Sequence, residues 1–125
     1  MTDMPETAAC TETTAYKVLT AEQMTVLEHE GSFAGAAVDL ADGYIHLSTA
    51  AQLTETVDKH FAGQDGLHVA AVDLAALGDA IRWEASRGGQ LFPHLYGQPL
   101  SLATVIAYGP LERGDDGTVQ LPVTG

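Results

Sequence analysis

The sequence predicts an α+β domain with a mainly antiparallel, split sheet of five or six strands and two main helices. Helical and strand patterns are mixed along the chain, without the strict βαβα alternation that indicates a parallel sheet. Two Thr-x-x-Gln capping boxes, at Thr20 and Thr49, mark the starts of two helices. Several short segments alternate apolar and polar residues, which is typical of strands with one buried face.

The first half of the chain is expected to form strand, helix, loop, strand and helix. Residues 16–19 suit a short strand, and the helix opened by Thr20 runs to Gly31 with an apolar stripe. Residues 32–42 are expected to form a loop that ends in a turn at Asp42 and Gly43. Residues 44–47 suit a strand. The second helix, ending at Gly63, places its apolar residues on one stripe: Ala50, Leu53, Val57 and Phe61.

The second half is expected to be richer in strands. Residues 67–74, 81–85 and 103–111 suit strands, and residues 74–77 suit a single helical turn. Residues 88–101, rich in glycine and proline, are expected to form a long loop. Residues 119–123 suit an edge strand, where Pro122 would be tolerated. The expected organisation is a flexible tail over 1–14, one globular domain over 15–113 and an extension over 114–125.

Composition excludes several classes of partner. The net charge is −12, from 17 acidic and 5 basic residues, which argues against binding to nucleic acid or to anionic membranes. The N-terminal residues lack the basic start and apolar run of a secretory signal. Cys10 is the only cysteine, which excludes an internal disulfide and fits a reducing cytoplasm. The expected location is therefore cytoplasmic.

The first candidate site segment is residues 43–49. Tyr44, His46 and Ser48 share one face of the expected strand. Ser48 and Thr49 add hydroxyl groups at the start of a helix, where backbone N–H groups attract anions. Two structural interpretations stay open: His46 as a hydrogen-bonded core residue, and Thr49 as a cap only.

The second candidate segment is residues 83–97. Long loops of this kind are often functional, and paired Gly88 and Gly89 allow close approach of a ligand. Arg87 suits a phosphate or carboxylate, which a guanidinium binds through two hydrogen bonds. The remaining polar candidates here are Glu84, His94 and Tyr96. The structural alternative is an ion pair between Glu84 and Arg87, with a turn at residues 93–94.

Other chemistries have weaker support. His46, His94 and Glu84 are residue types that bind zinc, but no short pair such as His-x-x-x-His is present, so no metal is expected. No Gly-x-Ser-x-Gly elbow accompanies the serines, although a Ser/His/Asp triad stays open. The glycine-rich fingerprints of nucleotide-binding loops are also missing from the sequence.

Three motifs carry a family resemblance. Residues 16–19, 42–50 and 83–97 resemble the bacterial family called Domain of Unknown Function 952, over most of the folded chain. That family resembles the ADP-ribosyltransferase-like superfamily, whose split, mostly antiparallel sheet holds an NAD cleft between its halves. The resemblance implies that His46, Ser48 and Thr49 line such a cleft. The chain departs from the transferase pattern in two ways. It offers Tyr16 and Lys17 where arginine or histidine is expected, and its last strand has no glutamate in the usual catalytic setting, for which Glu84 is a candidate substitute.

These observations lead to three hypotheses. The first is an enzyme acting on NAD, ADP-ribose or a related nucleotide; the second is a non-catalytic module that binds a small anionic metabolite; the third is a purely structural role. No resident cofactor is indicated, NAD enters only as a candidate substrate, and the oligomeric state is open. The candidate catalytic residues are His46, His94 and Glu84. The candidate ligand-binding residues are Lys17, Tyr44, Ser48, Thr49, Arg87, Gly88, Gly89 and Tyr96.

Overall fold

Both Thr-x-x-Gln boxes cap helices in the computed structural model, which describes residues 13–85 and 89–122. In each box the threonine hydroxyl accepts from the glutamine N–H, and the glutamine side chain accepts from the threonine N–H. The first box opens α2 (Ala21–Glu30), which ends as predicted at Gly31, where φ is 75°. The second opens α4 (Ala50–His60), which ends before Gly63.

The class is α+β with antiparallel sheets, as predicted, but the described residues hold more elements than expected. They form eight strands in three sheets, ordered β1-β4-β8, β2-β7 and β3-β6-β5. The strands are β1 (Thr14–Leu19), β2 (Ser32–Phe33), β3 (Ile45–His46), β4 (His68–Asp73), β5 (Ile81–Ala85), β6 (Leu91–Leu95), β7 (Leu100–Ser101) and β8 (Val105–Pro110). Two further helices are α3 (Ala37–Asp42) and α5 (Leu74–Leu77), and η1 (Gly78–Ala80) and η3 (Leu102–Thr104) are 3₁₀ turns.

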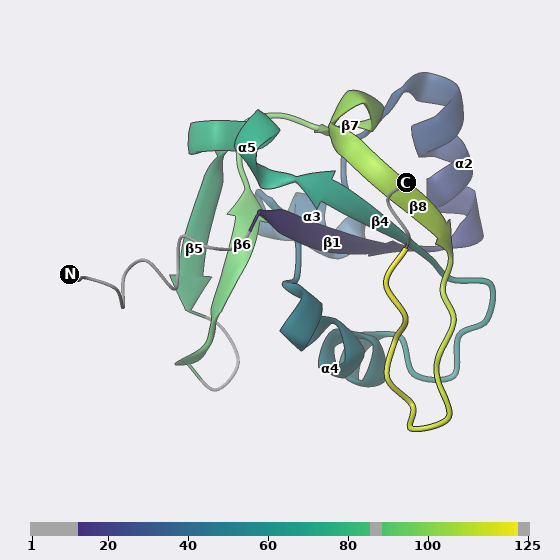
Figure 1. Ribbon diagram of the computed structural model, residues 1–125. Coiled ribbons are helices and arrows are strands. Elements are labelled where there is room, and N and C mark those ends of the chain that lie inside the picture. Colours follow the sequence, from purple (N-terminus) through teal and green to yellow (C-terminus); the bar gives the residue numbers. More distant parts are fainter. Residues whose placement is uncertain (1–12, 86–88, 123–125) are drawn as a thin grey trace.

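The two three-stranded sheets touch through one isolated bridge, between Tyr16 and Ser48. Tyr16 and Ser48 exchange both backbone hydrogen bonds, at 2.7 and 2.9 Å. Beyond this bridge β1 continues along β4, whereas β3 pairs with β6. Figure 1 shows β5 and β6 on one side of the molecule and β1, β4 and β8 on the other, with α4 beneath β1. The sheets therefore diverge from a shared point.

Pro93 explains why β3 leaves β6 so early. Leu47 donates its N–H to the Pro93 carbonyl at 3.1 Å, so the two residues form a hydrogen-bonding position of the ladder. Proline has no N–H with which to return the second bond. The β3–β6 pairing ends at this position, and the chain turns to meet β1 at Ser48. A proline inside the central strand β6 is tolerated because its nitrogen faces the end of β3.

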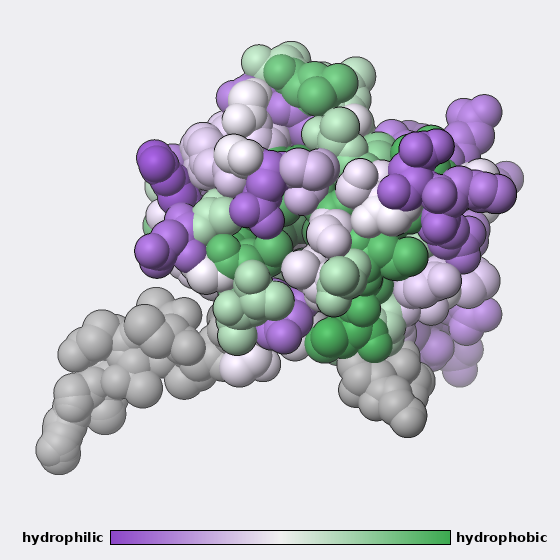
Figure 2. Space-filling view, turned by 90° about the horizontal axis from the view of Figure 1, so that it is seen from above, coloured by the Kyte–Doolittle hydropathy of each residue, from purple (hydrophilic) through white to green (hydrophobic). Residues whose placement is uncertain are grey.

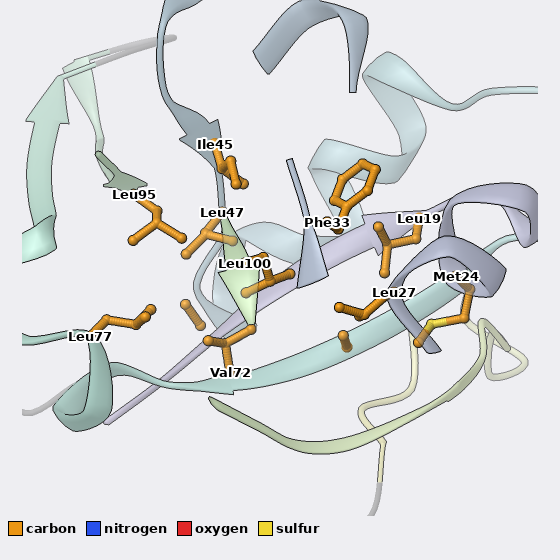
Figure 3. Close-up of a cluster of buried hydrophobic side chains, with 12 residues drawn as sticks. Leu19, Met24, Leu27, Phe33, Ile45, Leu47, Val72, Leu77, Leu95 and Leu100 are labelled. Carbon is orange, nitrogen blue, oxygen red and sulfur yellow. The ribbon is translucent and has the colours of Figure 1, made fainter. Parts of the chain in front are cut away.

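Two apolar clusters hold the sheets together. One lies on the inner face of β3 and β6, where Ile45, Leu47 and Leu95 point toward Leu100 and Val72 (Figure 3). The other lies between α4 and the β1-β4-β8 sheet, and its buried members are Tyr16, Val18, Leu53, Val57, Leu67, Val69, Ala71 and Val119. Leu53 and Val57 supply the buried stripe of α4, as predicted, whereas Ala50 is exposed and Phe61 is only partly buried.

Three local predictions are wrong. The expected loop over 32–42 contains β2 and α3, and α3 is organised by the buried carboxylate of Asp39, which accepts the Ala36 N–H at 2.7 Å. The expected loop over 88–101 contains β6 and β7. Of the expected edge strand at 119–123, residues 119–122 form only a single bridge, between Val119 and Arg113, and residue 123 lies outside the described part of the chain. In the first two cases a tertiary contact overrides local composition.

The surface mixes polar and apolar residues. On the face shown in Figure 2, hydrophilic residues gather at two sides and hydrophobic patches lie between them. Within residues 13–85 and 89–122, no helix has the length and apolar character needed to cross a bilayer.

Candidate functional site

One face of the β3-β6-β5 sheet collects the polar and aromatic candidates. The register places His46 beside His94, and His94 beside Arg82. Because side chains alternate along a strand, Tyr44 and His46 share this face with His94 and Tyr96. Tyr44 stacks on His94 with ring centroids 4.2 Å apart, and the rings of His46 and His94 lie 5.4 Å apart. The opposite face carries the apolar residues of the inner cluster.

Asp39 anchors the first half of the site. Its side chain is 1% exposed. One oxygen, Oδ1, accepts the His46 ring Nδ1 at 2.7 Å and the His46 backbone N–H at 3.0 Å. The other, Oδ2, accepts the Lys17 ammonium at 2.9 Å and the Ala36 N–H. Lys17 also donates to the His46 carbonyl at 3.1 Å. A single carboxylate therefore fixes the positions of both a lysine and a histidine.

Burial and pairing act in opposite directions on the pKa of each partner in this pair. Burial by itself raises the pKa of Asp39, but the hydrogen bond from His46 and the nearby Lys17 charge outweigh it, so this pKa lies well below its ordinary range. For Lys17, burial lowers the pKa, and the charge of Asp39 opposes that shift only in part. The ionised carboxylate is the form that the fold stabilises.

Acid should therefore weaken the fold through Asp39. The unfolded carboxyl has a pKa of about 3.9, and the folded pKa is lower, so the unfolded chain binds the proton first as pH falls. The stabilisation is complete above about pH 4–5 and declines below it. We expect the difference in the free energy of unfolding between the wild type and Asp39→Asn to narrow as pH falls from 5 to 3. Urea denaturation at each pH measures this difference, and a constant difference would contradict the assignment.

Glu84 anchors the second half of the site. Its Oε1 accepts the His94 ring Nδ1 at 2.7 Å and the Tyr96 hydroxyl at 2.7 Å. The His94 side chain is 4% exposed, whereas that of Glu84 is 38% exposed. The hydrogen bonds from His94 and Tyr96 lower the pKa of Glu84. The Arg82 guanidinium lies 4.7 Å from the centre of the Tyr96 ring. A half-exposed carboxylate thus orients a buried imidazole.

The Tyr96 hydroxyl gives a direct reading of this arrangement. Its hydrogen bond to Glu84 raises the pKa of Tyr96 to about 12, because ionisation would break the bond and oppose a carboxylate. We expect Tyr96 to ionise at a higher pH than a free tyrosine in a ¹³C NMR titration. Glu84→Gln should return the pKa of Tyr96 toward 10. An unchanged Tyr96 titration in Glu84→Gln would show that Glu84 does not set this pKa.

A cavity of about 610 Å³ fills the space where β1 and β3 diverge. Its polar wall includes Lys17, His46, His94 and Ser48, and its apolar wall includes Phe61 and Phe92. This volume lies in the range usual for small-molecule sites, which also combine apolar walls with a few polar groups.

Three polar groups at this wall have donors or acceptors to spare within the described residues. Lys17 uses two of its three ammonium protons. His94 uses Nδ1 for Glu84, and its Nε2 makes no hydrogen bond with a described residue. Because Tyr16 bonds toward Ser48, the strand alternation turns the N–H and C=O of Val18 to the same side, away from β4. Val18 and Ser48 both line the cavity, and the Val18 peptide groups turn to the Ser48 side of β1.

The structure therefore brings most of the sequence candidates together. His46, His94, Glu84, Tyr44, Tyr96 and Lys17 form one connected group. Ser48 lies on the cavity wall, where its hydroxyl is 2.9 Å from that of Thr56. Thr49 caps α4, and Gly89 is exposed with φ of 80°. Arg87 and Gly88 lie outside the described residues.

Asp39 and Asp42 are the residues that sequence reasoning missed. They fall in the segment expected to be a loop, where an aspartate is ordinarily solvated. Gly35 is the available signal: its φ is 129°, and a Cβ there would lie 2.9 Å from the Asp39 Cβ. The glycine admits the carboxylate to the interior.

A family model and solved structures are similar to this chain. The family model described as "Protein of unknown function (DUF952)" matches residues 18–108. The crystal structure of protein CC0527 from Caulobacter crescentus shares 45% identity, with a TM-score of 0.78, over 86% of this chain and 94% of that one. The solution NMR structure of CC0527 shares 45% identity, with a TM-score of 0.72, over 86% of this chain and 91% of that one. No curated protein matches this chain.

Proposed function

We propose that this protein, which belongs to the DUF952 family of unknown function, binds a small nucleotide-like molecule in the cavity between β1 and β3 and acts on it through His94. The candidate ligands are NAD, ADP-ribose and related nucleotides. The resemblance to the ADP-ribosyltransferase-like superfamily is part of this proposal, and the divergence of two antiparallel sheets from one bridge supports it.

The observation that carries the proposal is the state of His94. Its ring is buried, its Nδ1 is held by Glu84, and its Nε2 has no partner among the described residues although His94 lines the cavity. A carboxylate on one ring nitrogen fixes the orientation of an imidazole and leaves the other nitrogen to transfer protons. A purely structural histidine would be expected to use both nitrogens once buried.

The surrounding groups suit the parts of a nucleotide. Lys17 offers a spare N–H group to a phosphate, while Asp39 holds Lys17 and His46 in place from behind. The N–H and C=O of Val18 form an adjacent donor and acceptor, which match the edge of a base or a carboxamide. Phe61 and Phe92 supply apolar surface for a planar ring. In the reaction proposed for NAD, a water molecule attacks the ribose carbon that carries nicotinamide. His94 accepts a proton from that water, and the bond between ribose and nicotinamide breaks.

One observation favours a second function, binding without turnover. Glu84 Oε1 is already engaged by both His94 and Tyr96. A carboxylate held in this way supports a neighbouring ring rather than a reacting ribose. In that case the chain is a receptor for a small anionic metabolite, and His94 contributes only hydrogen bonds.

The test compares ligand binding and turnover in the wild type and in His94→Gln. We expect chemical-shift changes around the cavity when NAD, ADP-ribose or AMP is titrated into the wild type. Release of nicotinamide from NAD, followed by chromatography, is expected to fall by about 10²–10⁴-fold in His94→Gln, because an acid–base group is lost. Binding without any turnover in the wild type would favour the receptor instead.

The matched control is His29→Gln, the same change at an exposed position of α2. It should leave binding and turnover unchanged. Amide spectra of both variants report whether the fold is intact. If millimolar ligand causes no shifts in the wild type, the proposed function is wrong.

A further inference from the structure

His46 also contacts a second carboxylate, which is far more exposed than that of Asp39. The His46 Nε2 lies 3.0 Å from Asp42 Oδ2. The Asp42 side chain is 46% exposed, whereas that of Asp39 is 1% exposed. Asp42 is the last residue of α3 and lines the cavity beside Lys17 and His94. Asp39 is therefore an interior residue, whereas Asp42 is a half-exposed residue of the cavity wall.

The orientation of His46 does not depend on Asp42. Asp39 already fixes the ring through Nδ1, and the backbone N–H of His46 binds the same carboxylate oxygen. Asp42 therefore adds a second contact to a ring that Asp39 already orients. The Nε2–H bond would therefore stay directed at the same point if the Asp42 side chain turned away.

We infer that the point occupied by Asp42 Oδ2 is an oxyanion subsite, at which Asp42 competes with the phosphate group of a bound ligand. A carboxylate seated on Nε2 has the chemistry of the group that this nitrogen binds best, an oxyanion. Lys17 lines the same cavity and has an ammonium proton to spare, so it is the second donor available to an oxyanion that replaces Asp42. This inference rests on the proposed function, since it locates the anionic end of the proposed ligand.

Asp42 can leave at little cost. It is a surface side chain, and ion pairs of this exposure contribute little to stability. The next residue, Gly43, has φ of 88° and ends the helix, so the chain already turns away at this point. The advantage of Asp42 over a free ligand is proximity, because a tethered group acts at an effective concentration of about millimolar or more.

Removing the competitor should strengthen binding of anionic ligands only. We expect Asp42→Asn to bind AMP about tenfold more tightly than the wild type, since both the tethered rival and a like charge are lost. Adenosine, which lacks the phosphate, should bind equally to both proteins. Inorganic phosphate should shift the ¹⁵N resonance of His46 Nε2 at lower concentration in Asp42→Asn. Isothermal titration and NMR measure these quantities.

The matched control is Asp79→Asn, which removes the same charge from an exposed residue of η1. It should change the affinity for AMP by less than about twofold, as a distant surface charge is screened. Equal gains in Asp42→Asn and Asp79→Asn, or an equal gain for adenosine, would overturn the subsite while the proposed function stands. Absence of AMP binding in every protein would remove both.

Discussion

Replacing Asp39 with alanine is expected to lower the free energy of unfolding by about 3–5 kcal/mol, which is the usual cost of breaking a buried ion pair from one side. The change leaves the Lys17 ammonium buried without its counter-ion, because the Lys17 side chain is 7% exposed. It also removes the acceptor for the Ala36 N–H and for two donors of His46. Urea denaturation followed by circular dichroism measures the loss.

Two comparisons isolate the cause of that loss. Asp42→Ala removes a carboxylate from the same helix and from the same histidine, but at an exposed site, and should cost less than about 0.5 kcal/mol. Lys17→Met in the Asp39→Ala background should recover part of the stability, because the uncompensated charge is gone. A double variant whose loss equals the sum of the two single losses would show that the residues are not coupled.

Leu53→Ala is expected to lower the free energy of unfolding by about 2–5 kcal/mol, the range for removing a leucine from a packed core. Leu53 is 1% exposed and packs in the cluster that joins α4 to β1 and β4. Because α4 also carries Thr56 and His60 on the cavity wall, the variant should loosen that wall. Thermal and urea unfolding measure stability, and hydrogen exchange of the α4 amides measures the loosening.

The control for Leu53→Ala is Glu55→Ala, on the exposed side of the same helix. Glu55 pairs with Lys59 at 3.8 Å, and a surface pair of this kind contributes little. The expected change is below about 0.5 kcal/mol. A loss of similar size in both variants would mean that helix propensity, rather than burial, decides the stability of α4.

Local signals predicted the parts of the fold that local chemistry determines. The capping boxes at Thr20 and Thr49 and the strand at residues 81–85 are observed because caps and alternation act within a few residues. The strand β6 was missed because its composition is that of a loop. It is extended only because β3 and β5 pair with it on both sides, and that information lies outside the segment.

The same distinction holds for the site. His46 and His94 were identified because histidines next to hydroxyl and aromatic residues are chemically conspicuous, and the register places them side by side. The partner of each ring was harder to find. Glu84 is ten residues from His94 across a hairpin, and Asp39 lies in a segment whose helix depends on its own buried carboxylate. Only the folded chain shows which carboxylate orients each of these two imidazoles.

The missing N–H of Pro93 limits the β3–β6 ladder by covalent structure. Side chains on a wall can repack, and a helix can shift, but an imino nitrogen cannot acquire a hydrogen. β3 is therefore prevented from zipping further along β6 whatever residues surround it. The hydrogen bond missing at Pro93 does not depend on the residues that line the cavity. Those residues can therefore be substituted, and the ligand preference changed, without extending the β3–β6 ladder.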